Sequence, residues 1–258
     1  DELLRQIDVF KKMGFGGFHM HVRTGLETEY LSDEFMDYIK ACVKKAKDNN
    51  MLSYLYDEDR WPSGAAGGIV TKEKDEYRQR MLRITTVPYT SKKLGVVAGH
   101  EGSNARTEDG ELITCFDIVL DQDGYLKSYN QIGFDDISDG TKWYVYLDKS
   151  PKATWFNNQS YIDTLNKDAM DRFIEITYET YLKNCGKDFG KTIPSIFTDE
   201  PQFSHKRRID YPTDKEDITL PWTPDLAKTF KETYGEDLIA GIPELFWNLP
   251  KGKVSTIR

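Results

Sequence analysis

Cysteine and long apolar runs are both scarce in this sequence of 258 residues. Its three cysteines, Cys42, Cys115 and Cys185, lie far apart, lack the short spacings of a metal site and cannot all pair within one chain. No apolar stretch approaches the roughly 18 residues of a membrane span, and no signal-type segment is visible. We therefore expect no membrane insertion, and a start at Asp1 suggests a mature protein or an excised fragment.

Cations are also in the minority. The chain has 35 Lys and Arg against 43 Asp and Glu, a formal net charge of −8 at pH 7. Binding to nucleic acid or to an anionic membrane requires clustered cations, and here only Lys44–Lys47 and Lys206–Arg208 form short clusters. Neither partner is expected. With 38% apolar and 30% charged residues, the composition indicates a folded chain with a buried core.

Apolar periodicity indicates that strands and helices alternate near the start of the chain. The stretches 15–22 and 51–56 are apolar enough for buried strands. Between them Ser32 is a suitable N-cap for a helix whose apolar stripe ends in lysines. Strand, helix and strand in this order are typical of a parallel sheet.

The pattern changes between 83 and 155. The stretches 112–120, 125–132 and 142–147 have the composition of strands, and Asp121–Gly124 has the composition of a turn between the first two. Short strands joined by turns predict an inserted antiparallel β module. Helical periodicity then returns from Asn166, which is a suitable N-cap.

A helix from Asn166 to about 183 precedes a third predicted buried strand at 193–198, and another helix opens near Pro224. We therefore expect an α/β fold, a (β/α) TIM-type barrel. Its parts would be 1–82 as the first portion, 83–155 as the inserted β module and 156–258 as the later portion. A doubly wound parallel sheet is the alternative.

The expected barrel would be incomplete, because eight βα units usually take roughly 250 residues and the insert leaves fewer than that. An open parallel sheet exposes apolar faces and unpaired backbone groups. We therefore expect the open edge to be covered by further domains of a longer parent protein or by a second copy of the chain.

Polar side chains occur at the end of each of the three predicted parallel strands. Because the carboxyl ends of such strands meet at one edge of a sheet, we expect these groups to share a pocket. They are His19, His21 and Arg23 after the first strand, Asp57, Glu58, Asp59 and Arg60 after the second, and Asp199 and Glu200 after the third.

Cleavage of a glycosidic bond generally requires two carboxyl groups that face one another. One protonates the leaving oxygen, and the other activates water or attacks the anomeric carbon. We expect Glu200 and Glu58 to form this pair, with Asp199 and Asp57 beside them as further catalytic candidates. The expected substrate-binding residues are the flat aromatic rings and hydrogen-bonding groups nearby, namely Tyr56, Trp61, Phe203, His19, His21, Arg23, Asp59 and Arg60.

Other interpretations stay open. The alternative for each carboxylate is that it only caps a helix or holds a loop, which would leave a non-catalytic carbohydrate-binding or scaffold fragment. His19 and His21 also match the start of a metal-dependent amidohydrolase-type barrel, with His100 and His205 as the remaining histidines. No cofactor is expected, although Asp57–Asp59 offers oxygen ligands of the kind that Ca2+ takes, without the regular calcium-loop spacing.

Three stretches carry a resemblance to a known family: Gly16–Gly25, Tyr56–Gly68 and Phe197–Pro201. They resemble the barrel domain of large bacterial glycoside hydrolases, nearest to the α-L-rhamnosidase-like group, glycoside hydrolase family 106 and its relatives. This resemblance implies a catalytic barrel with two acidic residues, carried over to 57–58 and 199–200, and a polysaccharide or oligosaccharide substrate. It further implies inversion in the rhamnosidases themselves, and a periplasmic or extracellular location.

Overall fold

The computed structural model of the chain describes residues 1–22, 25–89 and 110–258. It divides the chain into two compact units, each made of two segments. The first unit consists of Asp1–Arg78 and Lys152–Gln202, and the second of Gln79–Pro151 and Phe203–Arg258.

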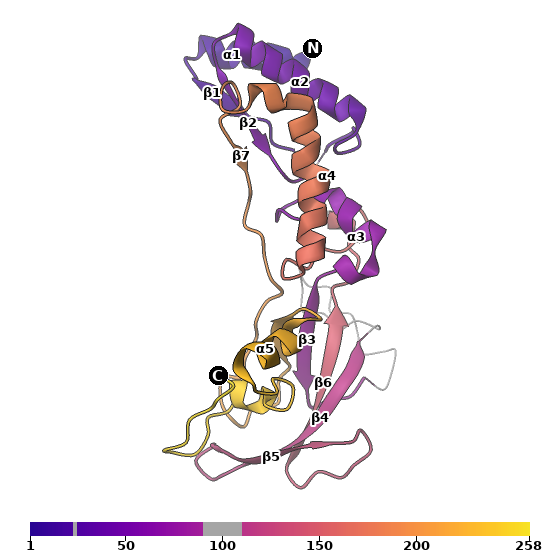
Figure 1. The fold of residues 1–258 in the computed structure, drawn as a ribbon, viewed down its shortest axis with the longest axis vertical. Helices are drawn as coiled ribbons and strands as arrows, with labels where there is room; N and C mark the ends of the chain where they lie inside the picture. Colours follow the sequence, from indigo (N-terminus) through magenta and orange to yellow (C-terminus); the bar gives the residue numbers. More distant parts are fainter. Residues whose placement is uncertain (23–24, 90–109) are drawn as a thin grey trace. The chain divides into compact units, whose positions relative to one another are not determined.

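The first unit is built on a small parallel sheet. Its three strands, β1 (Gly17–His19), β2 (Leu52–Tyr56) and β7 (Ile196–Phe197), lie in the order β1-β2-β7, and both pairings are parallel. Figure 1 shows these strands beside the helices of the same unit, which are α1 (Glu2–Lys12), α2 (Asp33–Asp48), α3 (Ile69–Glu73) and α4 (Lys167–Cys185).

Side chains alternate between the two faces of this sheet, because successive Cβ atoms of a strand point in opposite directions. Leu55 and Ile196 lie on the face that packs against α2 and α4, in a core with Phe35, Phe173 and Tyr181. The opposite face carries the aromatic and imidazole rings described in the next subsection.

Both helices that form this core begin at the predicted residue. The Ser32 side chain accepts a hydrogen bond from the Phe35 amide at 3.2 Å. The Asn166 side chain accepts hydrogen bonds from the amides of Asp168 at 3.0 Å and Ala169 at 3.3 Å. The sequence-based prediction of these two N-caps is therefore confirmed.

Replacing the α4 N-cap should measurably destabilise the first unit. The Asn166→Ala change removes the acceptor for two otherwise unpaired amides, and we expect it to lower the free energy of unfolding by about 1 kcal/mol. Urea titration of both variants measures this. Asn166→Ser restores an acceptor and should recover most of the loss; equal losses in the two variants would contradict the capping role.

The second unit is a five-stranded antiparallel sheet. Its strands are β3 (Arg80–Thr85), β4 (Glu111–Leu120), β5 (Leu126–Ile132), β6 (Thr141–Lys149) and β8 (Ile218–Trp222), in the order β5-β4-β6-β3-β8. The predicted antiparallel pairing of 112–120, 125–132 and 142–147 is confirmed by the β4–β5 and β4–β6 ladders. Trp143 from β6 packs edge-on against Trp247 in the core, with ring centroids 5.2 Å apart.

The prediction of a (β/α) TIM-type barrel is wrong. In the described residues only three strands are parallel, and five others form a separate antiparallel sheet, so the fold is a β-rich α+β fold. The segment assigned to the later barrel supplies β8, which pairs antiparallel with β3, and α5 (Leu226–Tyr234), which packs on that antiparallel sheet. Apolar periodicity shows that a segment is a strand or a helix, whereas strand direction is set by distant pairing partners.

The three cysteines form no disulfide bond. Cys42, Cys115 and Cys185 are all buried and unpaired in disulfides, and burial raises the pKa of the Cys185 thiol to about 11. Cys185 packs in the core at the end of α4. Across the described ranges, no helix combines the length and the hydropathy required to cross a membrane.

Candidate functional site

Rings from all three parallel strands meet on the sheet face opposite the helices. The strand register places His19 beside Tyr54 and Tyr56 beside Phe197. His19 stacks on Tyr54 with ring centroids 4.7 Å apart, and Phe197 stacks on Tyr56 at 5.3 Å. His21, which follows β1, also stacks on Tyr56, with ring centroids 3.9 Å apart. Segments that are distant in sequence therefore form one continuous surface, which we call the ring face.

The Tyr56 hydroxyl links two carboxyl groups at the end of the ring face. It donates a short hydrogen bond to Asp199 Oδ2 and also hydrogen-bonds with Glu58. Burial, followed by the hydrogen bond to Asp199, raises the pKa of Tyr56 well above its usual value, so this phenol keeps its proton at neutral pH. Glu58 Oε1 also lies 3.6 Å from His21 Nε2.

The carboxylates of this cluster differ in their access to solvent. The Glu58 side chain is only 1% exposed, so it cannot reach a substrate in this conformation. Asp199 is partly exposed and Glu200 is exposed. Glu200 has a φ of 45°, a left-handed backbone conformation that is strained for a residue with a side chain and that recurs at functional sites. The accessible acids are thus the two at the end of β7.

Backbone contacts hold Asp199 in place. Its amide donates to Ser63 Oγ at 2.8 Å, and its carbonyl accepts from the Ser63 amide at 2.9 Å. Ser63 Oγ in turn donates to Asp57 Oδ1 at 2.5 Å. The loop that follows β2 therefore fixes the loop that follows β7.

Asp57 is a buried structural carboxylate. It is fully buried and accepts hydrogen bonds from Ser63, Tyr178 at 2.6 Å and Thr198 at 2.8 Å. These contacts join β2, α4 and the end of β7. Burial, followed by the hydrogen bond to Asp57, raises the pKa of Tyr178 to about 12. With its oxygens occupied by hydroxyl donors, Asp57 supports the site without contacting a substrate.

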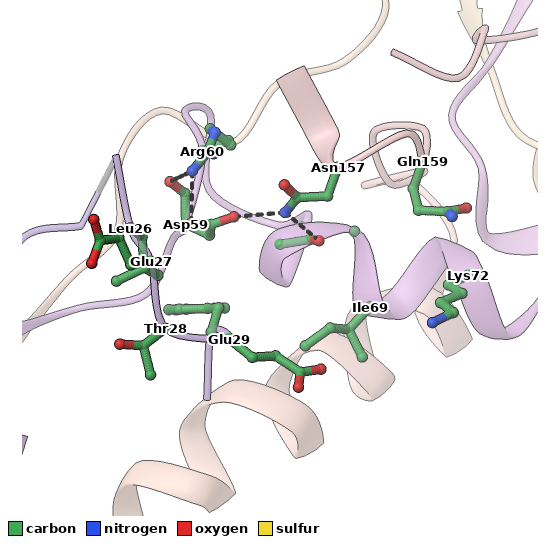
Figure 2. A pocket seen from close by; sticks show the side chains of 13 residues that line it. Leu26, Glu27, Thr28, Glu29, Asp59, Arg60, Ile69, Lys72, Asn157 and Gln159 are labelled. Atoms are coloured by element: carbon green, nitrogen blue, oxygen red, sulfur yellow. Dashed lines mark hydrogen bonds and ion pairs between the residues drawn. The ribbon is translucent and has the colours of Figure 1, made fainter. Parts of the chain in front are cut away.

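Asp59 belongs to a neighbouring pocket of about 420 Å³, which Figure 2 shows. One Asp59 oxygen accepts from Arg60 and the other from Asn157, both at 2.8 Å. Gly67 allows this arrangement, because a Cβ there would lie 3.3 Å from Asp59 Oδ2 and its φ of +64° disfavours other residues. Glu27, Glu29 and Lys72 add charged groups to the lining.

The remaining predicted residues are placed differently. Arg23 lies outside the described residues. Trp61 is half-buried, and its carbonyl accepts a hydrogen bond from the Trp155 indole at 2.6 Å. Phe203 is exposed and belongs to the second unit. The structure therefore brings together His19, His21, Tyr56, Glu58 and Asp199, and it places Asp59 and Arg60 together in the pocket.

Sequence reasoning missed several residues of this site. Phe197 is 45% exposed on the ring face, where its ring contacts those of Tyr56 and His19, yet the sequence placed it only in a strand and in the stretch Phe197–Pro201, without a role in substrate binding. Its spacing of two from Asp199 was the available signal, since alternate residues of a strand point to the same side. Asn157 and Tyr178 had no such signal, because they come from distant segments.

The buried tyrosines predict a loss of stability at high pH. Burial raises the pKa of Tyr161, Tyr178 and Tyr181, in addition to Tyr56. Below about pH 10 the phenols are neutral in both the folded and the unfolded state; above it the unfolded chain ionises first, so we expect stability to fall as pH rises from about 10 to about 12. The exposed tyrosines, such as Tyr211 and Tyr234, should ionise near pH 10 in the folded chain, and the tyrosinate absorbance of the buried phenols should then appear together with unfolding. Ionisation of all the tyrosines near pH 10 in a chain that stays folded would contradict this.

The metal-dependent alternative lacks a ready set of ligands in the described ranges, where no group of three or more His, Cys, Asp or Glu side chains is arranged to hold a metal ion. His100 lies outside those ranges. Comparisons of the chain with protein-family models, curated proteins and solved structures find no match. The resemblance to the α-L-rhamnosidase-like group thus stays a prediction.

Proposed function

We propose that this chain is a glycoside hydrolase that acts on a polysaccharide or oligosaccharide through two carboxylates at the end of β7. The observation that carries the proposal is the partly exposed Asp199 carboxylate, held by the buried Tyr56 hydroxyl beside the exposed Phe197 ring. An oriented acid next to a flat apolar ring suits a sugar, because the ring can cover the C–H face while the acid reaches the glycosidic bond.

The two accessible acids have different proposed roles. Asp199 accepts the Tyr56 hydrogen bond, which suits the base or nucleophile, the member of the pair that works as a carboxylate. Glu200 makes no hydrogen bond or ion pair with any residue that the structure describes, so its carboxyl group is available to protonate the leaving oxygen. Glu58, which the sequence suggested as one of the two catalytic carboxylates, is buried and here positions the Tyr56 hydroxyl.

The proposed substrate contacts are the ring face and the pocket. Phe197 and His19 are exposed and lie edge to face with their centroids 6.1 Å apart, a surface for stacking against a sugar. In the pocket, Asp59, Arg60 and Asn157 form a linked set of donors and acceptors of the kind that binds sugar hydroxyls.

A non-catalytic carbohydrate-binding role is the second candidate. It is favoured by the state of three carboxyl groups near the site. Asp57 accepts hydrogen bonds from three hydroxyl groups, and Asp59 accepts hydrogen bonds from Arg60 and Asn157. Glu58 is buried. The two candidates are separated by assaying sugar release from aryl glycosides, including rhamnosides, and from plant and host polysaccharides. Binding of a glycan that is never cleaved would favour the second.

The Tyr56→Phe change tests whether the hydroxyl orients the acid. It removes the hydrogen bonds of the hydroxyl with Asp199 and Glu58 and keeps the stacked ring, so we expect kcat to fall about tenfold, equivalent to about 1.4 kcal/mol. Tyr54→Phe is the matched control, since Tyr54 lies two residues earlier on the same strand and also stacks on a histidine. An equal decrease in both variants would contradict the orienting role.

A further inference from the structure

The short basic run Lys206–Arg208 contributes to a pocket in the second unit that has no part in the proposed catalytic site. The pocket has a volume of about 370 Å³. Its lining comes from three separate stretches: Lys206 and Arg208–Asp210 before β8, Leu245–Phe246 and Asn248 after α5, and Arg258. A concave site of this volume is large enough for a small organic molecule.

Strand-like alternation explains why two of the three basic residues face the pocket. The Arg207 backbone forms an isolated antiparallel bridge with Thr219, with hydrogen bonds of 2.9 and 3.1 Å. In such extended backbone successive side chains point to opposite sides. Arg207 pairs with Glu216 at 2.5 Å, while Lys206 and Arg208 line the pocket.

The third cation is held in position by neutral oxygens. The Arg258 guanidinium donates to the Glu244 carbonyl at 3.1 Å, to Asn248 Oδ1 at 2.7 Å and to the Trp247 carbonyl at 3.2 Å. A guanidinium has five N–H groups, so these contacts leave donors for a ligand and do not neutralise the charge. The result is an oriented cation at the wall of the pocket.

The charges that line this pocket do not cancel. Lys206, Arg208 and Arg258 form no ion pair with any residue that the structure describes, and Asp210 is the single carboxylate in the lining. Counting side chains alone, three cations face one carboxylate, which is an excess of positive charge in a chain whose overall charge is −8. An anionic ligand group would balance this excess.

We propose that this pocket binds the phosphate monoester group of a small organic molecule. Such a group carries about −1.5 to −2 charges at neutral pH and has three strong acceptor oxygens, which suit the ammonium of Lys206 and the guanidinium groups of Arg208 and Arg258. Ile209, Leu245 and Phe246 provide apolar surface for the organic part of the ligand. This site is independent of the proposed hydrolase activity.

Isothermal titration calorimetry of the full chain tests the proposal, with glucose 6-phosphate, inorganic phosphate, glucose 6-sulfate and glucose as probes at constant ionic strength. We expect glucose 6-phosphate to bind with a Kd of about 1 mM or lower, and glucose to show no binding that the double variant described next weakens. The double variant Lys206→Gln, Arg208→Gln should weaken binding at least about tenfold. Arg207→Gln, its matched control, should bind as the unchanged chain does.

Each departure from this pattern has a definite meaning. Equal binding of glucose 6-sulfate, a monoanion, would overturn the assignment to a dianion. Equal weakening in Arg207→Gln and in the double variant would indicate general charge attraction and overturn the site. Absence of any phosphate binding would overturn the proposal as a whole. Circular dichroism of the variants, whose changed side chains are exposed, confirms that they fold.

Discussion

Replacing Asp199 with Asn is expected to lower the rate of glycoside hydrolysis by about 10²–10⁴-fold while the fold is retained. Asn keeps an oxygen that can accept the Tyr56 hydrogen bond, so the loops after β2 and β7 should stay joined. What is lost is a carboxylate that can attack the anomeric carbon or remove a proton from water. The measurement is kcat and KM on the best substrate found in the panel.

The choice of leaving group separates the roles of the two acids. A glycoside with a good aryl leaving group needs little protonation, so Glu200→Gln should keep most of its rate on that substrate and lose it on a natural glycan. Asp199→Asn should lose most of its rate on both substrates. The reverse pattern would exchange the two roles, and full activity of both variants would remove these residues from the mechanism.

A control for these variants is an acid of similar charge away from the site. Asp48 is 55% exposed at the end of α2 and pairs with Lys44. Asp48→Asn should leave kcat and KM unchanged, because neither the ring face nor the pocket includes it. A decrease similar to that of Asp199→Asn would indicate an effect of net charge alone.

The largest expected effect on stability is that of Asp57→Ala. The change removes a fully buried carboxylate and leaves the hydroxyl groups of Ser63, Tyr178 and Thr198 without their acceptor. Each buried hydroxyl left without its acceptor costs about 1–3 kcal/mol, so we expect the three together to lower the free energy of unfolding by at least about 3 kcal/mol. Urea titration, followed by a signal from the first unit, measures the loss.

Two comparisons make this result interpretable. Asp57→Asn keeps one acceptor oxygen and should lose less stability than Asp57→Ala. Asp48→Ala removes an exposed carboxylate and should change stability little. If Asp57→Ala were as stable as Asp48→Ala, the hydroxyl network would not be the support for the loop after β2 that its contacts indicate.

Local features of this protein were predictable because they depend on neighbouring residues. The N-caps Ser32 and Asn166 and the hairpin turn at Asp121–Gly124 each follow from a few side chains within one turn of chain. The predicted approach of His21, Tyr56 and Asp199 also agrees with the geometry, since all three follow or end parallel strands that share one edge.

What the amino-acid sequence determined by itself is thus the approximate position of β1, β2 and β4 to β7, the N-caps of α2 and α4, and the acids that follow the parallel strands, whereas β3 and β8 were not predicted. Tertiary structure alone decided that Ile218–Trp222 pairs with β3 instead of extending the parallel sheet, and that Glu58 is buried while Asp199 remains accessible. The physical reason is range: capping and alternation act over a few residues, whereas strand pairing and burial depend on partners more than a hundred positions away.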